Sequence, residues 1–193
     1  MIKILFSVFI LFSLSTLYSC TPGGVLASGG ATTMVVAEGD RTLGTVVDDA
    51  TIKINISSNL LSSSTNLFVN VNTSVIEGRV LLTGIVDTQE IRIEAVRKVW
   101  EVDGVREVIN EIEIGSKTTI KEYANDLWIT TQVKGMAAKT IGLRALSYNF
   151  ETIKGRVYIA GITSRPEQLD QIIEATKTVK GVKEIVNYVI IKE

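Results

Sequence analysis

The segment Ile76–Gly84, with the sequence IEGRVLLTG, decides the fold because it occurs a second time, as IKGRVYIAG at Ile153–Gly161. The two copies lie 77 residues apart, and the same offset aligns Gly104 with Gly181 without a gap. A constant offset with aligned glycines indicates an internal repeat. The chain is therefore predicted to contain two copies of one small domain.

Each copy is predicted to fold as αββαβ. Apolar residues recur at helical spacing in the first segment of each copy, and we expect the aligned Asp49 and Asp126 to cap these helices. Two alternating strands, a second helix and a last strand follow, the strands at 68–71, 80–86 and 105–114, and at 148–153, 157–162 and 182–191. The predicted fold class is α+β, with two helices on one face of a three-stranded mixed sheet in each copy.

The predicted organisation has five segments: a signal peptide at 1–19, a lipidated tether at 20–45, a first domain at 46–115, a linker at 116–125 and a second domain at 126–193. About 70 residues give a domain only a marginal core. We therefore expect the two domains to pack against each other.

Six glycines fall at aligned positions and are predicted to be structural. Gly78, Gly84, Gly155 and Gly161 lie at a hairpin turn or in a strand, not between a strand and a helix, where a loop that binds phosphate would need them. Gly104 and Gly181 are predicted to end the second helix of each copy. The six glycines are Gly78, Gly84, Gly104, Gly155, Gly161 and Gly181.

The composition excludes several classes of chemistry. The 193 residues include no histidine and one cysteine, so histidine-based catalysis, histidine-bound metals and an internal disulfide are excluded. The net charge of −1 gives no chain-wide positive field for nucleic acid. Glu90, Glu94 and Glu101 are spaced for ion pairs with neighbouring basic residues on a helix. We predict no enzyme activity, no catalytic residue, no metal and no cofactor.

The N-terminus has the composition of a signal peptide. Lys3 precedes an apolar run from Ile4 to Leu17, which is shorter than the roughly 20 residues that cross a bilayer. Leu17-Tyr18-Ser19-Cys20 resembles the bacterial lipobox, and this resemblance implies acylation of Cys20, as with palmitate. The alternative is an incidental cysteine after an ordinary cleavage site. Thr21 follows the cysteine, and by the same resemblance it favours an outer-membrane address.

The repeated segment carries a family resemblance. The pattern of Ile76–Gly84, followed by Gly104-Val105 and Asn110, resembles the BON domain, and the second copy fits equally. A lipobox before two such domains is similar to the dual-BON outer-membrane lipoproteins of Gram-negative bacteria. The flanking stretches Arg41–Asp49 and Asn125–Thr131 match that family as well.

The resemblance implies a lipid-anchored protein that faces the periplasm. It further implies binding of anionic phospholipid, such as phosphatidylglycerol or cardiolipin, by the second domain. A position at the division site, a role in outer-membrane integrity and a link to β-barrel assembly also come with the family.

One difference between the copies supports a lipid site independently of the family. Trp128 stands on the first helix of the second copy, where the first copy has Thr51. Lys134 and Lys139 lie on the same helix, and Leu127 is a second candidate for insertion. Tryptophan beside basic residues suits the headgroup region of an anionic bilayer.

Two alternatives remain open at this point. Trp128 can instead pack against the linker or the first domain, with the lysines only solvating the surface. The whole protein can also be an adaptor that docks an envelope complex, such as the outer-membrane assembly machinery, with incidental lipid contact. Trp100 is predicted to make a contact between the domains or at the edge of the core.

Overall fold

The computed structural model describes residues 41–116 and 118–192, which belong to one compact unit. The predicted signal peptide, the predicted acylation of Cys20 and residues 20–40 of the predicted tether lie outside the described residues.

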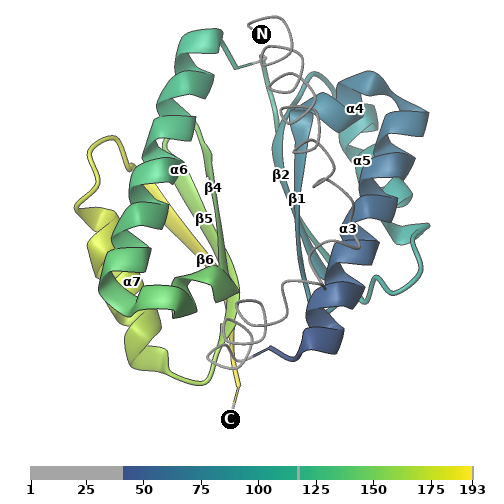
Figure 1. The fold of residues 1–193 in the computed structure, drawn as a ribbon. Coiled ribbons are helices and arrows are strands. Elements are labelled where there is room, and N and C mark those ends of the chain that lie inside the picture. Colours follow the sequence, from purple (N-terminus) through teal and green to yellow (C-terminus); the bar gives the residue numbers. More distant parts are fainter. Residues whose placement is uncertain (1–40, 117, 193) are drawn as a thin grey trace, which may run out of the picture. The chain divides into compact units, whose positions relative to one another are not determined.

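Two repeats follow each other in the described chain (Figure 1). The first consists of α3 (Leu43–Ser63), α4 (Thr65–Asn70), β1 (Val71–Ile76), β2 (Arg79–Val86), α5 (Gln89–Trp100) and β3 (Glu107–Ile114). The second consists of α6 (Ile120–Ile141), the 3₁₀ helix η2 (Gly142–Ser147), β4 (Tyr148–Ile153), β5 (Arg156–Thr163), α7 (Pro166–Lys177) and β6 (Glu184–Ile191). The order αββαβ is confirmed, with one additional short helix before the first strand of each repeat.

Each repeat forms a three-stranded mixed sheet. In the first sheet β2 lies in the centre, antiparallel to β1 and parallel to β3. In the second sheet β5 has the same place between β4 and β6. The registers also correspond, since Val71 pairs with Gly84 and Tyr148 with Gly161.

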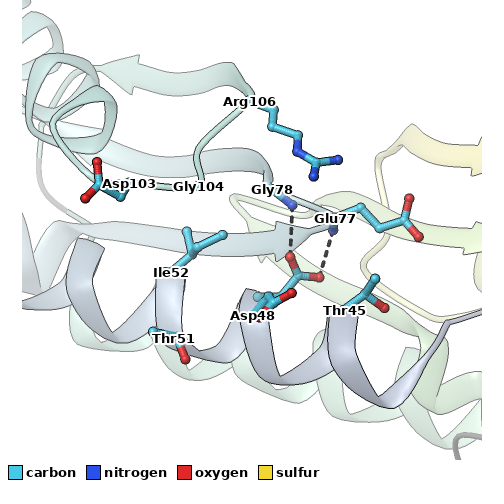
Figure 2. Close-up of a pocket in the computed structure, with 10 residues that line it drawn as sticks. Thr45, Asp48, Thr51, Ile52, Glu77, Gly78, Asp103, Gly104 and Arg106 are labelled. Carbon is cyan, nitrogen blue, oxygen red and sulfur yellow. Dashed lines mark hydrogen bonds between the residues drawn. The ribbon is translucent and has the colours of Figure 1, made fainter.

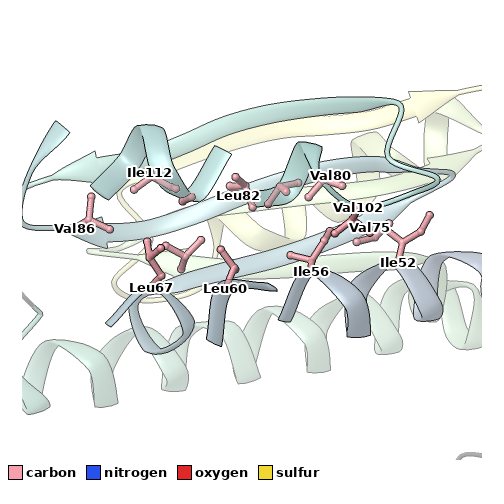
Figure 3. Packing of buried hydrophobic residues seen from close by; sticks show 13 residues of the cluster. Ile52, Ile56, Leu60, Leu67, Val75, Val80, Leu82, Val86, Val102 and Ile112 are labelled. Carbon is pink, nitrogen blue, oxygen red and sulfur yellow. The ribbon is translucent and has the colours of Figure 1, made fainter. Parts of the chain in front are cut away.

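One face of each sheet is covered by its own helices. In the first repeat α3 and α5 cover the sheet and share one core with it. Figure 3 shows Ile56 and Leu60 of α3 pointing toward the sheet. Ile56 of α3, Val99 of α5 and Leu82 of β2 are completely buried there. The apolar stripe that predicted the helix is thus the stripe that packs on the sheet. The second repeat builds an equivalent core around Ile129, Val133, Val157, Ile159 and Ile172.

The opposite faces of the two sheets share a third apolar cluster. Ile76 and Leu81 of the first sheet lie in one cluster with Tyr158, Ala160 and Ile162 of the second. Both faces of each central strand are therefore buried, which explains why β2 and β5 are almost uniformly apolar. The contact expected between the two repeats is present.

Polar contacts accompany this cluster. The Asn149 side-chain amide donates to the Ser74 hydroxyl at 2.8 Å, and Arg156 lies 3.0 Å from Glu113. The Tyr188 hydroxyl donates to the Glu111 carboxylate. Burial, followed by this hydrogen bond, raises the pKa of Tyr188 to about 12.

The predicted helix starts are wrong. Thr42 caps α3, and Thr119 caps α6 through a capping box with Glu122. Asp49 and Asp126 instead lie within their helices and are buried. The second half of the predicted linker is consequently the beginning of α6.

The strand predicted at 68–71 is also wrong for most of its length. Residues 65–70 form α4, which the Ser64 hydroxyl caps by accepting from the Asn66 amide, and β1 begins only at Val71. Leu67 of α4 is buried in the first core, so this short helix contributes to the packing of the repeat.

Candidate functional site

The residues predicted to bind phospholipid all lie on α6, and all four are exposed. Trp128 and Leu127 keep 49% and 56% of their surface accessible. Lys134 and Lys139 are exposed as well. The buried side of the helix is formed by Asp126, Ile129, Thr130, Val133 and Ala137. Trp128 is therefore not a core residue, and about half of its surface faces solvent.

The four candidates do not form one cluster. At 100° per residue, Leu127 and Lys134 share one side of the helix, about 20° apart. Trp128 and Lys139 share another side, but 11 residues separate them, so they lie about 16 Å apart along the axis. Leu127 and Lys134 both line a pocket that also includes Thr130 and Glu151.

Lys134 borders an open groove between α6, η2 and β4. The groove has a volume of about 570 Å³ and is lined mainly by apolar residues, among them Ala138, Leu143, Leu146 and Phe150. Leu143 and Leu146 are 53% and 62% exposed. Sequence analysis missed these two leucines, although apolar residues on both sides of Arg144 were a visible signal.

A carboxylate lies near Lys134. Burial raises the pKa of Glu151 on β4, whereas the charges of Lys134 and Lys53 oppose that rise. Lys134 therefore faces a carboxylate of its own repeat, which weakens its attraction for an external anion.

The hairpin turn of each repeat is fastened to the first helix by the buried aspartate. The Asp126 carboxylate accepts from the backbone N–H groups of Lys154 at 2.7 Å and Gly155 at 2.9 Å. Asp49 accepts in the same way from the N–H groups of Glu77 and Gly78. Figure 2 marks these two bonds as dashed lines that begin at Glu77 and Gly78. Both turn residues have positive φ in each repeat, so their N–H groups converge on one acceptor.

The loop after α7 closes over the same part of α6. A Cβ on Gly181 would lie 2.9 Å from Cδ1 of Ile129, the residue next to Trp128. The Lys183 amide donates to the Gly155 carbonyl at 2.8 Å, and its ammonium donates to the Lys154 carbonyl at 2.9 Å. These contacts bring the turn and the loop, which carry Lys154, Lys180 and Lys183, against the part of α6 that contains Asp126 and Ile129.

Sequence analysis missed these three lysines. The signal that would have found them is the repeat offset, which aligns Lys154 with Glu77 and Lys180 with Asp103. At both aligned positions an acidic residue of the first repeat is replaced by a lysine in the second. This change is visible in the sequence, but its meaning depends on knowing that the turn and the loop lie against α6.

In the first repeat the corresponding place is an open pocket of about 450 Å³. Figure 2 shows Thr51 and Ile52 on α3, with Glu77 and Gly78 of the turn and Asp103, Gly104 and Arg106 of the loop around it. The same three elements therefore meet in both repeats, with different side chains.

The glycines predicted to be structural lie where the backbone has a positive φ or where a side chain would collide with a neighbouring residue. A Cβ on Gly84, whose φ is +137°, would lie 2.0 Å from the Asn70 carbonyl oxygen. At Gly161 the corresponding Cβ would lie 2.8 Å from the Tyr148 ring. Gly78, Gly104, Gly155 and Gly181 all have positive φ at turns or loops.

Two further features bear on function. Within residues 41–116 and 118–192, no group of three or more His, Cys, Asp or Glu side chains is arranged to hold a metal ion. No helix in this part of the chain combines the length and apolarity needed to cross a membrane.

The chain resembles several known proteins along most of its length. It is 38% identical over 147 residues to a protein of Anaplasma centrale described as the uncharacterized protein in gshII 5'region, covering 76% of this chain and 96% of that one. It is 29% identical over 160 residues to the outer membrane lipoprotein DolP of Haemophilus influenzae, covering 82% of each chain. It is 31% identical over 154 residues to the 21 kDa hemolysin of Actinobacillus pleuropneumoniae, covering 77% and 78%.

A family model matches both repeats. The BON domain model fits residues 48–116 and residues 125–193, which together make up most of the chain. These two segments begin within α3 and α6 and contain the rest of the two αββαβ repeats of the structure. The chain therefore belongs to the BON-domain family, with two BON domains in tandem.

Proposed function

We propose that this protein is a non-enzymatic outer-membrane lipoprotein whose second BON domain binds the surface of an anionic phospholipid bilayer. The similarity to the outer membrane lipoprotein DolP over 82% of both chains supports an outer-membrane location and a lipid anchor. The lipobox-like Leu17–Cys20 supports acylation of Cys20, which would hold the protein on the periplasmic side of the membrane.

Lipid binding rests mainly on one observation, the exposure of Trp128 on α6. A tryptophan with 49% of its surface accessible exposes apolar area at a position where the first repeat has threonine. Indole rings favour the membrane interface, where the ring contacts acyl chains and the N–H contacts headgroups. Basic residues around it add attraction for anionic lipid.

The test is co-sedimentation of residues 21–193 with vesicles. We expect binding to vesicles that contain phosphatidylglycerol or cardiolipin, but not to phosphatidylcholine vesicles, and we expect Trp128→Ala to abolish it. Trp100→Ala is the matched control because Trp100, at the end of α5, is 52% exposed. Equal loss in both variants, or equal binding to neutral vesicles, would contradict a lipid site at Trp128.

The anchor is tested separately. Cys20→Ser should abolish incorporation of labelled palmitate and release the protein from the outer-membrane fraction. A Cys20→Ser protein that remains in that fraction without acylation would contradict the proposed anchor.

The proposed role of the bound protein is to support outer-membrane integrity at the division site. This part comes from the family resemblance, and two readouts test it. A fluorescent fusion should gather at the division septum, and a deletion strain should become sensitive to detergent. An evenly distributed fusion would contradict the proposed position.

An adaptor role is the second candidate, and the groove between α6, η2 and β4 favours it. Exposed Leu143 and Leu146 beside an open groove are suited to an apolar segment of a protein partner, such as the β-barrel assembly machinery. In that case the wild-type protein would not bind either type of vesicle, and Leu146→Asp would reduce co-purification of the partner complex.

A further inference from the structure

The two BON domains carry opposite charges at one equivalent place. In the first, Thr51, Glu77, Asp103 and Arg106 line the pocket. With the offset of 77, the corresponding residues of the second are Trp128, Lys154, Lys180 and Lys183.

The structure shows that these positions correspond in space as well as in sequence. Each hairpin turn donates two N–H groups to the buried aspartate of its helix, at 2.7 and 2.9 Å in both repeats. A Cβ on Gly104 would lie 2.9 Å from Ile52 Cδ1, and one on Gly181 would lie 2.9 Å from Ile129 Cδ1. Helix, turn and loop therefore meet in the same way in both domains.

The charge difference is large for so small a surface. Apart from the buried aspartates, the first pocket has three acidic residues and one basic residue, a net charge of −2. The corresponding positions of the second domain have Glu122 and three lysines, a net charge of +2. None of the three lysines has a carboxylate partner within ion-pair distance in the described part of the chain.

The positive potential of this cluster reaches α6. Hydrogen bonds from Thr119 lower the pKa of Glu122, and the charges of Lys154 and Lys183 lower it further. Glu122 is moreover committed to the capping box of α6. The lysines therefore keep most of their charge available for a ligand from solvent.

We propose that Trp128, Lys154, Lys180 and Lys183 form one site, the Trp128 site, which binds the phosphate groups of anionic phospholipids in a bilayer. This inference rests on the proposed function and locates its electrostatic part. The three lysines of the site belong to the β4–β5 turn and the α7–β6 loop, and none belongs to α6. Lys134 and Lys139 of α6 therefore lie outside the site.

The chemistry favours a bilayer over a free phosphate. Lys180 and Lys183 are exposed, so their ammonium groups do not enclose a small anion. A half-exposed indole beside them gains from contact with the apolar edge of a headgroup layer, which a free anion lacks.

The experiment exchanges the charges with those of the first domain. The variant Lys154→Glu/Lys180→Asp places in the second domain the residues that the first domain carries at these positions, so the fold already accommodates them. The control Lys134→Glu/Lys139→Asp changes the net charge of the chain by the same amount on α6. Binding of residues 21–193 to phosphatidylglycerol vesicles is titrated for each, and far-UV circular dichroism verifies folding.

We expect the exchange to weaken binding at least about 25-fold, since each basic residue near an anionic surface contributes about fivefold in affinity. The control should weaken it less than about fivefold. The neutral variant Lys154→Gln/Lys180→Gln/Lys183→Gln, which reverses no charge, should also lose more than the control.

The outcomes separate this inference from the proposed function. If the wild type binds, Trp128→Ala does not, and the exchange loses no more than the control, the Trp128 site is refuted while lipid binding stands. If the wild type does not bind, the proposed function itself fails. Displacement of the bound protein by inorganic phosphate at matched ionic strength would overturn the assignment to a bilayer.

Discussion

Replacing Asp126 by alanine removes the acceptor that fastens the β4–β5 turn to α6. Asp126 is 6% exposed, and its carboxylate accepts from two backbone N–H groups, at 2.7 Å from Lys154 and 2.9 Å from Gly155. Gly155 is itself buried, so its N–H group has little access to water after the change. The substitution thus leaves two polar groups that have to find new partners.

The expected loss follows from these two bonds. A hydrogen bond to a charged group contributes about 1.5–3 kcal/mol, and a buried donor without a partner costs about 1–3 kcal/mol. Allowing for access of water to the Lys154 amide, we expect Asp126→Ala to lower the free energy of unfolding by about 3–5 kcal/mol. Asp126→Asn keeps one acceptor oxygen and should lose about half as much.

The assay is urea unfolding of residues 21–193 at neutral pH, followed by far-UV circular dichroism. Asn125→Ala is the control, because Asn125 is exposed on the same helix and should change the free energy by less than about 0.5 kcal/mol. Asp49→Ala should lose at least as much as Asp126→Ala, since Asp49 makes the same pair of bonds and in addition an ion pair with Arg41. A loss at Asp126 no larger than that at Asn125 would refute the anchoring role.

Two further predictions concern a glycine and a tyrosine. Gly84→Ala should destabilise the protein by more than about 2 kcal/mol, since its Cβ would lie 2.0 Å from the Asn70 carbonyl oxygen. Gly135→Ala should stabilise α6 by up to about 1 kcal/mol, because a Cβ at Gly135 would have no atom within 4 Å. Equal effects of the two variants in thermal unfolding would contradict both expectations. The pKa of Tyr188 is raised from 10.0 to about 12 in the folded protein, so folding favours the protonated phenol, and stability should fall as the pH rises from 10 towards 12. Tyr188→Phe should reduce this alkaline loss in urea titrations, and an unchanged pH profile would count against it.

Local patterns were sufficient to predict most of the secondary structure. The repeat, the hairpins and the second helices follow from periodicity and turn glycines, which depend on residues close in sequence. The mixed three-stranded sheet was predicted as well, and the pairing of β2 with both neighbours confirms it.

The role of the aspartates was beyond such reasoning. An aspartate near the start of a helix usually caps it, and the sequence does not distinguish that role from a buried anchor. The difference depends on a turn 28 residues further along the chain, whose N–H groups converge on Asp49 and Asp126 only in the folded domain. The true caps, Thr42 and Thr119, became evident only with the helices in place.

The sequence by itself determined that two copies of one αββαβ domain are present, and that one of them carries a tryptophan where the other has Thr51. Only the tertiary structure decided which turn and which loop lie against the helix that carries that tryptophan. Lys154 and Lys180 are 26 and 52 residues away from Trp128 along the chain, and the bonds of the turn to Asp126 and the close approach of Gly181 to Ile129 bring the segments that carry them to α6. Helical spacing can identify neighbours on one helix, but charges that act together across three elements are defined by packing.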